Sequence, residues 1–339
     1  MEGKVLSQIF PRVSIVTGTY NSMKYLDRLI DSVQAQTFTD WEMIFVDDGS
    51  HDGTREYLAR FCEENRKFRL ILKTPEGSPA KSRIVALEAA RGEYIAFCDH
   101  DDFWAPDKLQ IQIEAYRQYP DAAIVHTQRT LWYDAGRPKV YPRYEVKGDT
   151  FQIQSPHKVL YTGPKILFSS FMTKKSYLDK VGGLHPDLLG IDDYHIFLKL
   201  SEIGRILRVE LPLTYYYEHQ NNLSRVDNIF VDGYFRVLEA LKDEGASNKL
   251  VRVVSAHAFK SKGVTYLKDK PLKAFCYFGK SLFSFFLVRT LVLFTLSLGL
   301  TLVPSTVRSR FLQKVMKIKE KTPTLEDYVM RTKNKGAQG

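Results

Sequence analysis

The sequence has few cysteines and no extended apolar segment near its first residue. Cys62, Cys98 and Cys276 are far apart and form no CxxC or CxxH spacing, which excludes a disulfide framework and a zinc site of the usual spacing. Such cysteine usage is typical of reducing compartments. Residues 1–11 contain no long apolar run, so we expect no secretory signal there.

Motifs of several other protein classes are missing as well. No G-x-G-x-x-G follows the first apolar segment, which argues against an oxidoreductase that binds a dinucleotide. No glycine-rich phosphate loop precedes an activating basic residue, which argues against a nucleotide-sugar pyrophosphorylase. No nucleic-acid-binding module accompanies the basic residues, so we expect no nucleic-acid partner.

Charge of one sign is concentrated at one end of the chain. Residues 1–240 carry 30 Lys/Arg and 33 Asp/Glu, a net charge of −3. Residues 241–339 carry 19 Lys/Arg and 6 Asp/Glu, a net charge of +13. This pattern indicates a near-neutral body followed by a basic appendage that would be attracted to an anionic surface.

Apolar segments alternate with amphipathic stretches through the first 126 residues. The pattern predicts strands at 13–17, 43–46, 70–72, 94–98 and 122–126, and helices at 23–36, 54–64, 78–90 and 106–118. Strand–helix alternation predicts an α/β fold, with a mostly parallel sheet flanked by helices. Ligands of such a sheet bind beyond the carboxyl ends of its strands.

Five carboxylates follow two of these strands: Asp47, Asp48, Asp99, Asp101 and Asp102. Such a group repels itself unless a cation is bound, and an Asp-x-Asp suits a hard divalent metal that also accepts phosphate oxygens. The metal would stabilise a diphosphate leaving group. Alternatively, Asp99 and Asp102 cap the next helix or hold turns.

A second acidic pair, Asp192 and Asp193, opens a predicted helix that extends to Ile203. A carboxylate can act as the general base that takes a proton from an acceptor hydroxyl. The competing interpretation is helix capping, because an aspartate at this point satisfies free amides and suits the helix dipole. The same dipole would lower the carboxyl pKa, which is unhelpful for a base.

Several motifs together resemble those of glycosyltransferase family 2, whose members are inverting enzymes of GT-A fold, a Rossmann-like nucleotide-sugar-binding fold. They are Val13-Ser-Ile-Val-Thr-Gly-Thr-Tyr-Asn21, Ile44-Phe-Val-Asp-Asp-Gly-Ser-His-Asp-Gly-Thr54, Gly92-Glu-Tyr-Ile-Ala-Phe-Cys-Asp-His-Asp-Asp102, Val181-Gly-Gly-Leu184, Asp192-Asp193-Tyr194, and Tyr217-Glu-His219 with Ser224. The resemblance spans about residues 10 to 226. It implies a catalytic domain at 1–226 and leaves 227–339 as a C-terminal basic, helical region.

The resemblance also implies roles for individual residues. Those implied in nucleotide-sugar binding are Thr17, Tyr20, Asp48, Arg83, Asp99 and His100. Those implied in binding a divalent metal, Mn or Mg, are Asp99, Asp101, Asp102 and His219. Asp193 best matches the position of the base, and Asp192 is the second candidate.

Gly18 and the spacing of Tyr217 and His219 depart from the family pattern or fit it loosely. Gly18 stands where the family often has proline or another small residue, which leaves the assignment intact. The spacing of Tyr217 and His219 is one residue shorter than the family's Tyr-x-x-His, unless it is counted from Tyr216. A lone histidine is more often structural than a ligand. Arg225 is a weaker candidate for contact with the diphosphate.

Residues 281–303 form an apolar run with a single charge, Arg289. The run is long enough to cross a bilayer, but basic residues flank both ends, and such residues prefer the cytoplasmic side. We therefore expect an in-plane or re-entrant helix attached to an anionic membrane surface. The alternative is a helical hairpin buried against the catalytic body.

These observations predict an inverting, metal-dependent transferase that adds one sugar to a hydroxyl of a glycan or lipid-linked acceptor in cell-surface polysaccharide or lipopolysaccharide biosynthesis. A UDP-sugar is the favoured donor, although no motif specifies base or sugar. The expected location is the cytoplasm, peripheral or monotopic on the inner face of the plasma membrane. The absence of Gln-x-x-Arg-Trp disfavours processive synthesis. The alternative outside enzymes is a non-catalytic glycan- or lipid-binding scaffold.

Overall fold

The computed structural model describes residues 10–133, 144, 150–160, 166–219, 229–267, 270–284 and 288–301. The chain divides into two compact units, residues 1–226 and residues 227–339. Arg225, Ser224 and the basic segment after residue 301 lie outside the described residues.

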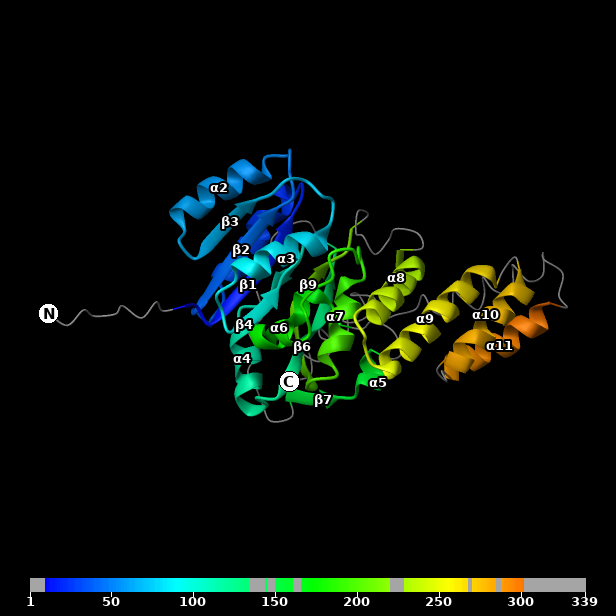
Figure 1. Ribbon diagram of the computed structural model, residues 1–339. Helices are drawn as coiled ribbons and strands as arrows, with labels where there is room; N and C mark the ends of the chain where they lie inside the picture. Colours follow the sequence, from blue (N-terminus) through cyan, green and yellow to red (C-terminus); the bar gives the residue numbers. More distant parts are fainter. Residues whose placement is uncertain are drawn as a thin grey trace, which may run out of the picture. The chain divides into compact units, whose positions relative to one another are not determined.

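The first unit contains one large sheet (Figure 1). Its described strands are β1 Val13–Thr19, β2 Trp41–Asp47, β3 Phe68–Leu72, β4 Tyr94–Phe97, β5 Phe103–Trp104, β6 Ala122–Trp132, β7 Phe151–Gln154, β8 Phe171–Lys174 and β9 Arg205–Tyr217. They are ordered β3-β2-β1-β4-β8-β6-β9-β5, and β7 pairs with β9.

The sheet is mixed, so the prediction of a mostly parallel sheet is corrected. β3, β2, β1 and β4 are parallel, as predicted. However, β8 runs antiparallel to both β4 and β6, and β5 and β7 run antiparallel to β9. The sequence pattern did not reveal β5, β7 or β8, which are short and pair with segments distant in sequence.

Helices accompany this sheet. They are α1 Met23–Gln34, α2 Thr54–Glu64, α3 Pro79–Ala89, α4 Lys108–Gln118, α5 Pro156–Val159, α6 Lys175–Lys180 and α7 Asp192–Leu200, with a 3-10 turn at Phe168–Ser170. The apolar stripe of α1, which includes Leu26, Leu29 and Val33, is fully buried, as its helical spacing predicts. α3 starts where the Ser78 hydroxyl accepts the amide of Lys81 and packs against β1 and β2.

The register of the parallel strands decides where polar loops meet. Thr19 at the end of β1 pairs with Asp47 at the end of β2, and Val16 pairs with Phe97 at the end of β4. The loops that follow these three strands therefore emerge at one edge of the sheet. This edge is where ligands of α/β proteins bind.

The second unit is an array of helices, α8 Ile229–Asp243, α9 Asn248–Tyr266, α10 Pro271–Ser284 and α11 Val288–Leu300. Each of these helices packs against the next (Figure 1). Gly263 of α9 is in contact with the ring of Phe278 on α10, and a Cβ at Gly263 would lie 2.6 Å from that ring. Phe278 packs here with Leu267, Ala274 and Leu300.

The apolar run 281–303 does not form one helix. Its first residues end α10, and its later residues form α11, which packs back on α10. Among the described residues, no helix combines the length and the apolar character needed to cross a bilayer. The apolar run therefore contributes to a helical hairpin within the second unit.

Candidate active site

The loops after β1 and β2 are joined by a dense set of hydrogen bonds. Asn21, which follows β1, adopts a left-handed backbone conformation with φ of 49°. Its backbone amide donates to the hydroxyl of Ser50 at 2.8 Å, and its side-chain oxygen accepts the amide of His51 at 3.0 Å. This conformation is uncommon outside glycine, although asparagine adopts it more readily than most residues. It presents the ring of Tyr20, which is 52% exposed, beside His51.

Asp48 lies at the predicted nucleotide pocket, but its carboxylate already has partners. It accepts the amides of Glu76 and Gly77 at 2.9 and 2.7 Å and pairs with the ammonium of Lys73. Burial alone would raise the pKa of Asp48, but the hydrogen bond from Lys73 and those amides hold it below its ordinary value. Asp48 therefore organises the loop that leads into α3.

Thr17 also has its hydroxyl engaged within the fold. It is fully buried on β1 and donates to the carbonyl oxygen of Cys98 at 2.8 Å. The bond joins β1 to the start of the acidic turn. The nucleotide-binding roles of Thr17 and Asp48 remain predictions; the structure shows both side chains in hydrogen bonds within the fold.

Arg83 on α3 connects the two acidic regions that the sequence places far apart. Its Nη2 is 2.6 Å from Oδ1 of Asp99, and its Nη1 is 2.8 Å from Oδ2 of Asp192. The guanidinium also stacks over the ring of Phe168, 4.4 Å from its centroid. One largely buried arginine side chain thus pairs with both the end of β4 and the start of α7.

Asp192 and Asp193 are the first two residues of α7, and their surroundings differ. Asp192 is buried against Arg83, and burial raises its pKa although Arg83 opposes this effect. Asp193 accepts the amide of Tyr194 at 2.6 Å. Burial and the neighbouring charge of Asp192 raise the pKa of Asp193 to about 7. The expectation that the helix dipole would lower this pKa is therefore corrected.

The acidic turn after β4 directs its carboxylates to different places. Asp99 faces Arg83, and its backbone amide donates to the hydroxyl oxygen of Ser169 at 3.0 Å. Asp101 Oδ2 lies 2.9 Å from Nε2 of His219, which follows β9. Asp102 is completely buried, and its Oδ1 accepts the amide of Tyr217 at 3.0 Å.

These placements bear on the predicted metal ligands. Asp101 Oδ2 and His219 Nε2 face each other as hydrogen-bond partners, and a carboxylate oxygen with an imidazole nitrogen is a donor pair that suits Mn²⁺ better than Mg²⁺ when phosphate oxygens complete the shell. Asp99 is paired with arginine, and the burial of Asp102 does not favour a ligand role. Within the described ranges, no group of three or more His, Cys, Asp or Glu side chains is arranged to hold a metal ion.

Aromatic rings surround the Asp101–His219 pair. The ring of Tyr25 on α1 lies 5.4 Å from His219, 5.6 Å from Tyr217 and 5.7 Å from His100. His100, predicted to contact the nucleotide-sugar, therefore lies at this cluster. The sequence does not mark Tyr25 as a site residue, because a buried tyrosine on a helix has no distinguishing pattern of its own.

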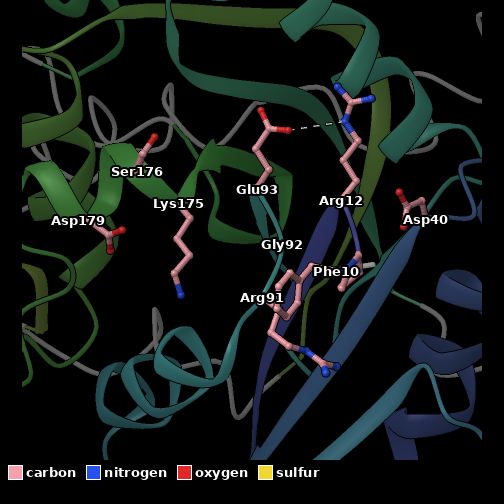
Figure 2. A pocket seen from close by; sticks show the side chains of 10 residues that line it. Phe10, Arg12, Asp40, Arg91, Gly92, Glu93, Lys175, Ser176 and Asp179 are labelled. Carbon is pink, nitrogen blue, oxygen red and sulfur yellow. Dashed lines mark ion pairs between the residues drawn. The ribbon is translucent and has the colours of Figure 1, made fainter. Parts of the chain in front are cut away.

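A hollow of about 600 Å³ lies at the opposite edge of the sheet (Figure 2). It is lined by residues at the amino ends of β1, β2 and β4 and by the start of α6: Phe10, Pro11, Arg12, Asp40, Arg91, Gly92, Glu93, Lys175, Ser176 and Asp179. Arg12 pairs with Glu93, and Lys175 donates to the carbonyl oxygens of Leu87 and Ala90. None of the predicted site residues lines this hollow.

The fold, with acidic side chains at the carboxyl ends of parallel strands, is that of α/β proteins that bind ligands at this edge. Residues 14–182 match glycosyl transferase family 2. TuaG of Bacillus subtilis (strain 168), named for teichuronic acid biosynthesis, is 40% identical over 38% of this chain and 50% of its own length. An uncharacterized glycosyltransferase of Nostoc sp. is 29% identical over 62% of this chain and 66% of its own length. The chain belongs to glycosyltransferase family 2.

Solved structures agree in fold. S. aureus TarS in complex with UDP-GlcNAc has a TM-score of 0.60 and 17% identity, over 83% of each chain. A mannosyltransferase of Pyrobaculum calidifontis in complex with GDP-Man and Mn²⁺ has a TM-score of 0.55 and 19% identity, over 91% of this chain and 87% of that chain. The chain spans only part of these curated relatives, 50% of the length of TuaG and 66% of the length of the Nostoc protein.

Proposed function

We propose that this chain is an inverting glycosyltransferase that moves one sugar from a nucleotide-sugar to a hydroxyl of a glycan or lipid-linked acceptor. The supporting observation is the bridge made by Arg83 between Asp99 and Asp192. It brings the predicted donor site next to Asp193, a carboxylate whose pKa of about 7 suits a general base.

In the proposed reaction, Asp193 accepts the proton of the acceptor hydroxyl. The hydroxyl oxygen forms a bond with the anomeric carbon of the sugar, and the bond from that carbon to the diphosphate oxygen breaks with its electron pair. Nucleoside diphosphate leaves from the face opposite the attack, so the anomeric configuration inverts. Asp192 is too tightly held by Arg83 to be the better base.

Asp101 and His219 would hold a divalent cation, Mn²⁺ or Mg²⁺. When bound, such a cation neutralises charge that develops on a diphosphate leaving group. Arg83 lies beside Asp99 and carries a fixed positive charge at the same edge. Tyr20, with its exposed ring, offers a surface on which a nucleobase can stack.

The proposal extends to where the enzyme works. The second unit exposes Leu272, Phe283 and Leu298 on α10 and α11, and Lys273 and Lys280 lie exposed on α10. Apolar side chains beside basic ones suit the surface of an anionic membrane. We therefore place the enzyme at the inner face of the plasma membrane, acting in cell-surface polysaccharide or lipopolysaccharide biosynthesis.

A donor panel tests the proposed reaction. Protein is incubated with UDP-, GDP- and dTDP-sugars and Mn²⁺ or Mg²⁺, and the nucleoside diphosphate released is measured with and without chelator. We expect release from one donor class, with a UDP-sugar favoured, and loss of release with chelator and in Asp101→Ala. The absence of both binding and release with every donor would contradict the proposal and favour a non-catalytic scaffold.

A further inference from the structure

Arg28 is a buried arginine on α1 that contacts the acidic turn. Arg28 is only 3% exposed to solvent. Its Nη2 donates to the backbone carbonyl oxygen of Asp101 at 2.8 Å. The bond fixes the backbone of the residue whose carboxylate faces His219.

The same guanidinium lies between two aromatic rings. Its Cζ is 4.5 Å from the ring centroid of Tyr217 and 4.9 Å from that of Phe103. A planar, delocalised guanidinium can stack on rings and donate in its own plane at once, which an ammonium cannot do. Phe103 follows the acidic turn, and Tyr217 ends β9.

These contacts join two segments, the turn that carries Asp101 and the end of β9 that leads to His219. The buried Asp102 makes a second connection, because it accepts the amide of Tyr217. Between the two segments, Asp101 Oδ2 and His219 Nε2 are 2.9 Å apart. The separation of these two atoms therefore depends on groups that do not themselves face the pair.

We propose that Arg28 is a positioning residue, which holds Asp101 and His219 at the spacing needed to bind a divalent cation together with a nucleoside diphosphate. This inference rests on the proposed function. Groups that orient metal ligands typically alter metal affinity about 10–100-fold when they are removed. Electrostatics alone predicts the opposite sign, because loss of a nearby positive charge would strengthen cation binding.

The test measures Mn²⁺ affinity by calorimetry on the full chain, with saturating UDP and, in parallel, saturating GDP. In Arg28→Met we expect Mn²⁺ affinity to fall about 10–100-fold. Arg28→Lys keeps the positive charge but loses the planar guanidinium that stacks on the rings, and we expect its Mn²⁺ affinity to fall by a similar factor. The matched control is Arg69→Met, which removes an arginine that bonds Glu42 and Ala89 away from the site and should leave Mn²⁺ affinity unchanged.

The outcomes separate this inference from the proposed function. Wild-type Mn²⁺ affinity in folded Arg28→Met, or in Arg28→Lys if the methionine variant does not fold, would overturn the inference alone. Tighter Mn²⁺ binding in Arg28→Met would also overturn it, and would show that the arginine acts only through its charge. Failure of the wild-type chain to bind Mn²⁺ with either nucleotide would remove the metal site, and with it both the metal dependence and the role of Arg28.

Discussion

At the scale of residues, the two aspartates at the start of α7 show how the surroundings separate chemically identical groups. Burial raises the pKa of both, but Asp192 pairs with Arg83, whereas Asp193 has the negative charge of Asp192 beside it. The helix dipole favours ionisation of both, but desolvation opposes it more strongly. The result is one carboxylate that orders the site and one that can accept a proton near neutral pH.

This difference predicts the pH dependence of turnover. Because only the ionised form of Asp193 accepts a proton, kcat/KM should rise with pH, level off above a midpoint of about 7, and fall about tenfold per unit below it. The measurement is donor turnover from pH 5 to about pH 9, a range that spans both ionisation states of the base.

Asp192→Asn provides a comparison for that profile. It removes a negative charge that helps to raise the pKa of Asp193, so the midpoint should move to lower pH even if kcat also falls. If the midpoint is the same in wild type and Asp192→Asn, or if kcat/KM of the wild type does not change with pH near 7, Asp193 is not the base.

Asp48 gives a second prediction, for stability. Its pKa is lowered in the fold, so its ionised form contributes stability at pH values above its unfolded pKa of about 4, and this contribution is lost as pH falls through the folded pKa. Asp48→Asn should therefore lower the free energy of unfolding by about 1–3 kcal/mol at neutral pH.

Tryptophan fluorescence during urea unfolding measures this change in the first unit, because Trp41, Trp104 and Trp132 all lie there. The difference between wild type and Asp48→Asn should shrink in acid, where the wild-type carboxyl is also protonated. A difference that is the same at neutral and acidic pH would show that the ion pair with Lys73 is not its source.

At the scale of elements, the sequence predicted long, periodic segments well. The helix over 54–64 has the predicted bounds, and the strands from β1 to β4 lie where apolar runs predicted them. In the second half of the sheet, β6 lies where the strand at 122–126 was predicted, but β8 was not predicted, since it pairs with strands that are distant in sequence. For the apolar run at 281–303 the sequence left both an in-plane or re-entrant helix and a helical hairpin open, and its described residues divide between α10 and α11, which pack together.

The candidate site follows the same division. The acidic motifs lie together at the carboxyl ends of parallel strands, as predicted, because an apolar run followed by polar residues is a recognisable pattern. Sequence could not show that Asp102 turns into the core, or that Arg28 reaches a backbone carbonyl. Every residue has a backbone carbonyl oxygen, so a hydrogen bond to one cannot be predicted from the residue type of the acceptor.

The contact between α9 and α10 gives a prediction at this scale. Gly263→Ala would place a Cβ 2.6 Å from the ring of Phe278, whereas Gly279→Ala would place one 3.5 Å from Phe294, an ordinary contact. We expect Gly263→Ala to destabilise the helical array by about 1–3 kcal/mol. We expect Gly279→Ala to be neutral or stabilising, because alanine favours helix more than glycine does.

Hydrogen exchange of amides in α9 and α10 measures this effect, since the second unit contains no tryptophan. Exchange in both helices should accelerate in Gly263→Ala alone. Equal exchange in the two variants would mean that the close packing of α9 on α10 does not limit stability there.

At the scale of the whole molecule, the asymmetry of charge predicts attraction to anionic lipid. The net charge of +13 after residue 240 contrasts with −3 before it. We expect the chain to bind phosphatidylglycerol vesicles, to bind phosphatidylcholine vesicles weakly, and to lose affinity as salt rises, because screening weakens surface electrostatics. Vesicle sedimentation measures each of these.

Matched variants locate that surface. Lys273→Glu with Lys280→Glu, or Phe283→Ser, should reduce vesicle binding, since each alters the exposed part of α10. Arg66→Glu with Lys180→Glu makes the same change of charge at two exposed residues of the first unit, and should reduce binding less. Equal losses from both pairs would indicate that net charge alone, and not this surface, governs attachment.

The central claim is that Asp193 is the base of a sugar transfer whose donor binds beside Arg83. The most direct measurement compares wild type with Asp193→Asn, using the donor that the panel identifies, for both donor affinity and release of nucleoside diphosphate in the presence of acceptor. We predict that Asp193→Asn binds the donor with near wild-type affinity and releases product about 10²–10⁴-fold more slowly. Release at the wild-type rate in Asp193→Asn would contradict the account.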